Sequence, residues 1–243
     1  MLYKSIIENK RVIFVGPSPM LIDQKRGDWI DSFDVVVRTN GASLLLNNLK
    51  FRRDYGTRMD ILNCNVQFHR EMKPLPIPYW VKNYGLKHIN FKTTASRFKE
   101  NYEKYVSIRS LKLLIKELQK IVPTVLMGPI VLTDILNHNP KELYMVGMDF
   151  FINKPDMFIP GDYREYIPGY LPKEITKKAD VDNIGRIDPH EQYANCKLIY
   201  DMYQKGDINT DEEIIEIMEV IMNSPEKYSC AGKRRRTCTA EII

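Results

Sequence analysis

The first informative property of this sequence is what it lacks. Only four cysteines occur in 243 residues, and they form neither a Cys-x-x-Cys pair nor a zinc-finger spacing. We therefore expect no zinc site. Free thiols in a reducing compartment are the main expectation, although Cys230 and Cys238 are close enough along the chain to pair.

Long apolar runs and a strong charge are missing as well. No window approaches the roughly 20 apolar residues of a membrane span, and residues 1–10 lack the apolar core of a signal peptide. The net charge is +5, most of it from the basic cluster at residues 233–236. We expect a cytoplasmic protein without a nucleic-acid partner, whose basic tail is either solvated or in peripheral contact with a membrane.

What is present is an alternation of short β-type runs with helical patterns. Arg11–Val15 and residues 34–38 are β-branched and bounded by turn residues, as in buried parallel strands. Further strands are expected at residues 59–63, 87–91 and 142–147, and helices at residues 95–121, 191–203 and 211–222, the last with Thr210 as N-cap. The pattern predicts an α/β, Rossmann-like, doubly wound and mostly parallel sheet.

Residues 150–189 break this rhythm with five prolines, three glycines and several tyrosines. A long connection without periodicity is usually functional or disordered, and the aromatic residues favour a packed lid over a linker. We therefore expect a core of residues 1–149 and 190–223, a lid at residues 150–189 and a basic tail at residues 224–243.

Small and amide residues follow three of the expected strands. Gly16, Asn40 and Asn65 would meet at one edge of a parallel sheet, where ligands bind in such folds. Pro17 and Pro19 remove two amide donors that a pyrophosphate would use, which disfavours a dinucleotide. Asparagine suits a ribose, a cytosine edge or a sugar carboxylate, but ordinary turn roles are the alternative.

His190 is the strongest candidate for a general base, because it follows the expected lid at the start of a helix. A helix N-terminus favours the neutral imidazole, although a surface histidine is the alternative. No Asp-x-Asp pair stands at a strand end to hold a divalent ion. Tyr163 and Tyr166 could therefore donate to a leaving phosphate, or simply pack the lid. Asp149 could bind a sugar hydroxyl or cap a turn.

Two stretches carry a resemblance to the sialyltransferases. The run Ile-Asp-x-x-Asp-x-Val-x-Arg-x-Asn-Gly-Ala from Ile30, followed by Gly56-Thr57-Arg58, resembles the long sialylmotif of the animal enzymes, glycosyltransferase family 29. Residues 141–150 resemble a strand of the bacterial lipooligosaccharide sialyltransferases, family 42. Gly128 falls where the bacterial enzymes contact the nucleotide, and His190 falls where both families keep the catalytic base.

The resemblance implies a GT-A-like sialyltransferase variant. Such an enzyme transfers sialic acid from CMP-sialic acid to a glycan hydroxyl by an inverting, metal-independent reaction, and it needs no further cofactor. The residues that would hold the nucleotide-sugar are Gly16, Ser18, Asn40, Asn65, Gly128, Gly147 and Asp149. His190 would deprotonate the acceptor, and Tyr163 and Tyr166 would stabilise the leaving phosphate.

Three departures from the family patterns keep other functions open. Pro17 stands where an asparagine is usual, Met127 replaces a serine, and Phe151 replaces the first lid tyrosine. One alternative is a catalytically inactive protein that binds CMP or a glycan on the same scaffold. The other is a transferase of a different CMP-activated acid such as Kdo.

Overall fold

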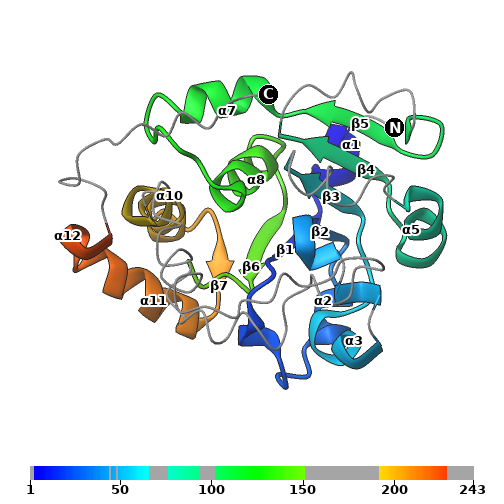
Figure 1. The fold of residues 1–243 in the computed structure, drawn as a ribbon, viewed down its shortest axis with the longest axis horizontal. Helices are drawn as coiled ribbons and strands as arrows, with labels where there is room; N and C mark the ends of the chain where they lie inside the picture. The colour runs from blue at the N-terminus through cyan, green and yellow to red at the C-terminus, as the bar shows by residue number, and fades with distance from the viewer. Residues whose placement is uncertain are drawn as a thin grey trace, which may run out of the picture.

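The computed structural model describes residues 3–43, 45–47, 49–65, 76–92, 102–150 and 192–228. These residues form an α/β fold around a seven-stranded sheet in the order β5-β4-β3-β2-β1-β6-β7, in which every pair of neighbours is parallel (Figure 1). The strands are β1 (Arg11–Val15), β2 (Val35–Thr39), β3 (Ile61–Cys64), β4 (His88–Phe91), β5 (Ser107–Ser110), β6 (Glu142–Val146) and β7 (Asn209–Thr210). The predicted Rossmann-like, doubly wound sheet is confirmed.

Helices cover both faces of the sheet (Figure 1). One face carries α1 (Tyr3–Ile7), α8 (Met127–Leu136), α10 (Gln192–Gln204) and α11 (Glu212–Met222), and the other carries α2 (Gly27–Asp31), α3 (Leu49–Tyr55) and α5 (Ile77–Tyr84). The remaining elements are α7 (Lys112–Leu118), which packs on α8, α12 (Pro225–Tyr228), and the 3-10 turns η1 (Pro19–Leu21), η2 (Asn40–Ser43) and η3 (Leu45–Asn47).

Side-chain alternation along the central strand explains this double covering. Val12 and Phe14 of β1 join the core beneath α1 and α8, whereas Ile13 and Val15 join the core beneath α2 and α3. All four side chains are fully buried. A strand that is apolar on both sides must be covered on both sides, so the continuous apolar run already encodes the two helical layers.

Two sequence predictions about elements were wrong. The expected helix at residues 95–121 holds strand β5 and the shorter helix α7 in its described part, because the segment Ser107–Ser110 pairs with β4 at the sheet edge. Thr210 is not the N-cap of α11. Its hydroxyl donates to the Met145 carbonyl from the two-residue strand β7, and Asp211 is the N-cap instead.

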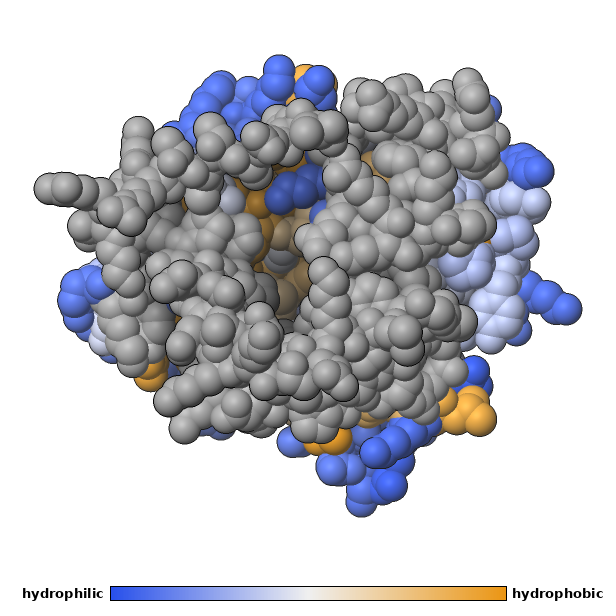
Figure 2. Space-filling model, viewed as in Figure 1, coloured by the Kyte–Doolittle hydropathy of each residue, from blue (hydrophilic) through white to orange (hydrophobic). Residues whose placement is uncertain are grey.

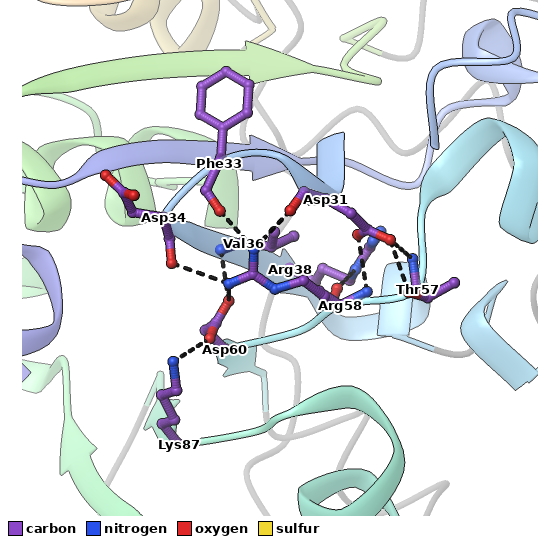
Figure 3. Close-up of polar contacts among 9 residues, drawn as sticks. All are labelled: Asp31, Phe33, Asp34, Val36, Arg38, Thr57, Arg58, Asp60 and Lys87. Atoms are coloured by element: carbon purple, nitrogen blue, oxygen red, sulfur yellow. Dashed lines mark hydrogen bonds and ion pairs between the residues drawn. The ribbon is translucent and has the colours of Figure 1, made fainter. Parts of the chain in front are cut away.

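A closed network of charges fixes the amino-terminal edge of the sheet (Figure 3). The Asp31 carboxylate accepts hydrogen bonds from the Thr57 amide and hydroxyl and from the Arg58 amide. The Arg58 guanidinium donates to three backbone carbonyls between residues 31 and 34 and to the Asp60 carboxylate. Asp60, which is 2% exposed, also accepts from the Val36 amide and pairs with Lys87 at 2.6 Å. The starts of β2, β3 and β4 are thereby held in register.

No helix in the described part of the chain is long and apolar enough to cross a membrane. Residues 151–191, which contain the expected lid with His190, Tyr163 and Tyr166, lie outside the described residues, as does the tail from residue 229 onward. The division into core, lid and tail stays a prediction.

Candidate functional site

The carboxyl ends of β1 and β6 meet where the strand order reverses. Strand β2 lies on one side of β1 and β6 lies on the other, so the crevice between β1 and β6 is the topological switch point at which such sheets bind ligands. Gly16 directly follows β1, and Gly147 directly follows β6 with a φ of +66°. A Cβ at Gly16 would lie 2.1 Å from the Gly147 carbonyl oxygen. Both glycines are therefore required first of all by the close approach of the two backbones.

The turn after β1 uses its amides inside the protein. The Gly16 amide donates to the Val146 carbonyl, the Ser18 amide donates to the Gly147 carbonyl, and Pro17 and Pro19 have no amide hydrogen. The Ser18 side chain, which is buried, accepts from the Met20 amide. The 3-10 turn η1, rather than an α-helix, follows this turn directly.

Asn40 and Asn65 do lie together, as their positions after neighbouring strands predict. The Asn40 Oδ1 atom accepts a hydrogen bond from the Asn65 amide at 2.8 Å. Asn40 has a φ of +39°, and its carbonyl accepts from the Ser43 hydroxyl. The left-handed conformation and the internal contact are the turn role that asparagine often takes. They also fix the side chain at the edge beside the switch point.

Gly128 and Asp149 lie close to the same edge. Gly128 is in the first turn of α8, and a Cβ there would come within 2.6 Å of the Met148 side chain. Gly128 therefore lets α8 pack against the segment that follows β6, which includes the buried Asp149. The carboxyl ends of the central strands thus bring together Gly16, Gly128, Gly147 and Asp149.

Helix α10 holds the entrance of α8 in place. The Asn195 side chain accepts from the Leu126 amide at 2.7 Å and donates to the Thr124 carbonyl at 2.8 Å. At the start of α10, Gln192 donates to the Phe150 carbonyl at 2.7 Å, one residue after Asp149. The first turn of the helix that follows the expected lid is therefore anchored at the carboxyl edge.

Two residues at this edge were missed by sequence reasoning. The Tyr55 hydroxyl donates to the Ser18 carbonyl at 2.5 Å, and the Tyr55 carbonyl accepts from the buried Arg38 guanidinium. Lys92 follows β4, and its ammonium donates to the Val125 carbonyl at 3.0 Å. The position of Lys92 directly after a predicted strand was a readable signal, whereas nothing local in the sequence pointed from Tyr55 to Ser18.

A polar ladder inside the sheet was missed as well. Asn63 donates to the Arg38 carbonyl, Asn90 donates to Asn63 Oδ1 at 2.9 Å, and His88 Nε2 bonds to Asn90 Oδ1 at 3.0 Å. Burial lowers the pKa of His88 to about 4, so its ring is neutral at neutral pH. This ladder links β2 to β4 beneath the candidate site.

One face of the molecule is hollowed. Figure 2 shows a hollow near α8 in which apolar and hydrophilic residues both lie. A separate cavity of about 240 Å³ flanks Gly147 and is lined mainly by η1, residues 24 and 26, and the start of α11. Its basic residue, Arg26, is paired with Asp211 at 2.5 Å.

The two cysteines of the described residues are buried and give no sign of reactivity. Cys64 and Cys196 are buried free thiols, and burial raises the pKa of both, that of Cys196 to about 12. Within the described ranges no group of three or more His, Cys, Asp or Glu side chains is arranged to hold a metal ion. The roles assigned to His190, Tyr163 and Tyr166 stay predictions.

Comparison with known proteins gives distant structural likenesses and nothing nearer. No protein-family model and no curated protein matches the chain. A solved structure, the alpha-2,3-sialyltransferase from Campylobacter jejuni in its apo form, is similar with a TM-score of 0.41 and 15% sequence identity, over 66% of this chain and 69% of that chain. A likeness this distant does not bear on the activity of this chain.

Proposed function

We propose that this chain is a glycosyltransferase that moves sialic acid from CMP-sialic acid to a hydroxyl of a glycan. The observation that carries the proposal is the meeting of Gly16, Asn40, Asn65 and the segment from Gly147 to Asp149 at one edge of a parallel sheet. These are the segments that resemble the sialyltransferase motifs. They stand at the position where open α/β sheets bind ligands.

The asparagines support a role in donor binding. Because Asn40 Oδ1 accepts from the Asn65 amide, the Asn40 Nδ2 group is the part of that side chain proposed to meet the donor. Asn65 directly follows the neighbouring strand β3, and we propose it as the second contact to the donor. We propose that Gly147 and Asp149 line the cytidine side, where Asp149 can accept a hydrogen bond from a sugar hydroxyl.

His190 is proposed as the general base, and the anchoring of α10 supports this role. Gln192 is tied to the Phe150 carbonyl, and two residues of chain reach at most about 7 Å. A base at residue 190 must lie within a short distance of the carboxyl ends of the strands, where the donor is proposed to bind. His190 would take the proton of the acceptor hydroxyl as its oxygen attacks the anomeric carbon, and the bond from that carbon to the CMP phosphate breaks with inversion. Tyr163 and Tyr166 would donate hydrogen bonds to the departing phosphate in place of a metal ion.

Variants of His190 test this reaction. We expect His190→Ala and His190→Asn to bind CMP as the wild type does, but to lose at least about 100-fold in transfer from CMP-sialic acid. The wild-type rate should rise with pH through the histidine range near 6.5, and the variants should lose that limb. CMP release that is unchanged in His190→Ala would remove His190 from the mechanism.

The turn after β1 favours one alternative, a protein that binds CMP or a glycan without catalysis. Its two amides are used internally and its two prolines offer none, so one route of phosphate stabilisation is missing. Such a protein would bind CMP in calorimetry and show no turnover with any acceptor. A donor panel that includes CMP-Kdo separates the sialic acid donor from other CMP-activated acids.

A further inference from the structure

Lys92 is placed between the two halves of the candidate site. It directly follows β4, and its amide donates to the Cys64 carbonyl at 2.9 Å, so its backbone lies beside the residue before Asn65. Its ammonium reaches the Val125 carbonyl at 3.0 Å, in the segment that leads into α8 and Gly128. The side chain therefore spans from the asparagine side of the edge to the entrance of α8.

The ammonium of Lys92 has only a neutral partner among the described residues. A lysine carries three donors, and the Val125 carbonyl occupies one of them. The side chain is partly buried, and this burial lowers the pKa of Lys92. A desolvated cation is costly without a countercharge, whereas Arg26 at the same edge already has one in Asp211.

The turn after β1 makes a cation at this edge more important. In many α/β proteins the first turn binds a phosphate through backbone amides. Here the amides of Gly16 and Ser18 donate to the carbonyls at the end of β6 instead. An anionic ligand at the carboxyl ends of the strands therefore cannot be bound by these two amides, and a side-chain cation can take over that part of its recognition. Lys92 is the partly buried cation in the described residues that stands beside Asn65 and faces the entrance of α8.

From this geometry we infer that Lys92 binds an anionic group of the CMP-activated sugar, either the phosphate or the sugar carboxylate. The inference rests on the proposed function, because it takes its ligand from there. In this inference Lys92 binds the negative charge of the ligand, which the amides of the turn after β1 cannot do.

Titration calorimetry with three ligands tests the assignment. The ligands are cytidine, CMP and a fluorinated CMP-sialic acid that resists cleavage, and the proteins are the wild type, Lys92→Met, Lys92→Arg and Lys112→Met. Lys112 is a matched control because it is an exposed lysine just after β5 at the same edge. We expect Lys92→Met to bind an anionic ligand at least about tenfold more weakly, with cytidine unchanged, Lys92→Arg partly restored and Lys112→Met within about twofold of wild type.

The pattern across ligands identifies the anion. Weaker binding of both CMP and the CMP-sugar assigns Lys92 to the phosphate, and weaker binding of the CMP-sugar alone assigns it to the carboxylate. Wild-type affinity of Lys92→Met for both ligands would overturn the inference while leaving the proposed function standing. A wild-type protein that binds neither ligand would overturn the proposed function itself.

A measurement on the wild type covers the case in which Lys92→Met does not fold. Reductive methylation of lysines, followed by mass spectrometry, is compared with and without saturating CMP-sialic acid analogue. Protection of Lys92 but not of Lys112 supports the inference. Equal methylation of Lys92 with and without the ligand contradicts it.

Discussion

The amino-terminal and carboxyl-terminal ends of the strands differ in how their charged and polar side chains are paired. At the amino-terminal edge, Asp31, Arg58 and Asp60 satisfy one another and the neighbouring backbone in a closed network (Figure 3). At the carboxyl-terminal edge, Lys92 finds only a carbonyl among the described residues, and Asn40 presents its side chain from a strained turn. Polar groups that satisfy one another hold the strands in place. Polar groups that keep unused hydrogen-bonding capacity can bind a ligand.

This contrast separates the residues that carry the sialyltransferase resemblance into two groups. Asp31, Thr57 and Arg58 belong to the amino edge and hold the strands in register. Asn40 and Asn65 belong to the carboxyl edge. The motif-like stretch therefore encodes the scaffold and the candidate site together, and mutations in the two groups should have different consequences.

The largest expected effect is on stability at the amino edge. Asp60→Ala leaves the Val36 amide, Arg58 and Lys87 without their carboxylate, and we expect a loss of about 3 to 4 kcal/mol in the free energy of unfolding. Denaturant unfolding measures it, and the exposed Asp28→Ala should stay within about 0.5 kcal/mol of wild type. The contrast between the edges breaks if folded Asp60→Ala loses CMP affinity without losing stability.

Acid should act through the buried polar ladder. The folded-state pKa of His88 is about 4 because of burial, below the ordinary value of 6.5, so the unfolded chain binds more protons between these pH values. The contribution of neutral His88 is complete above pH 6.5 and is lost as the pH falls toward 4, by at most about 3 kcal/mol. His88→Gln should flatten this part of the stability curve, and an unchanged slope would show that His88 is already charged or solvated.

The close approach of Gly16 and Gly147, just after β1 and β6, should link stability to binding. Gly16→Ala drives a methyl group into the Gly147 carbonyl, and we expect a cost of about 1 to 3 kcal/mol together with loss of CMP affinity. Gly85→Ala is the matched control, because Gly85 has a φ of +76° with open space around it and should cost about 1 kcal/mol without affecting CMP binding. Thermal unfolding measures the loss of stability and calorimetry measures the loss of CMP affinity. Equal CMP affinity in both variants would place the ligand away from the contact of Gly16 with Gly147.

The smallest expected effect concerns the support of the turn after β1. Tyr55→Phe removes only the hydroxyl that donates to the Ser18 carbonyl, and we expect a loss of about 1 kcal/mol and a several-fold weaker affinity for the donor. Tyr105→Phe, at an exposed tyrosine just before β5, should change neither. If the two variants bind the donor equally well, Tyr55 supports the fold alone.

Much of the fold was predictable because the strands are short, rich in apolar residues and followed by turn residues. β1 matches its predicted range, and β2, β3 and β4 lie within two residues of theirs. Strand β5 was missed because Ser107–Ser110 is short and polar, and its pairing with β4 is a tertiary contact that no local pattern announces. A single helix was predicted there because the helical spacing of the apolar residues was extended across that strand.

The candidate site was predictable only where chain position fixes it. Asn40 and Asn65 meet because parallel strands place their ends together, and that much follows from the order of the elements. The internal use of the Gly16 and Ser18 amides depends on β6, more than a hundred residues away, and could not be read locally. The contact of Tyr55 with Ser18 and the reach of Lys92 to Val125 depend on packing in the same way.

The most direct test of the account is to map where CMP binds. In amide NMR spectra recorded during a CMP titration, the account predicts shifts at Gly16, Asn40, Asn65, Gly128 and Gly147, with the amides of Thr57 and Arg58 unmoved. Shifts confined to the amino edge, or no shifts at saturating CMP, would contradict the claim that the carboxyl ends of these strands form a CMP-sugar site.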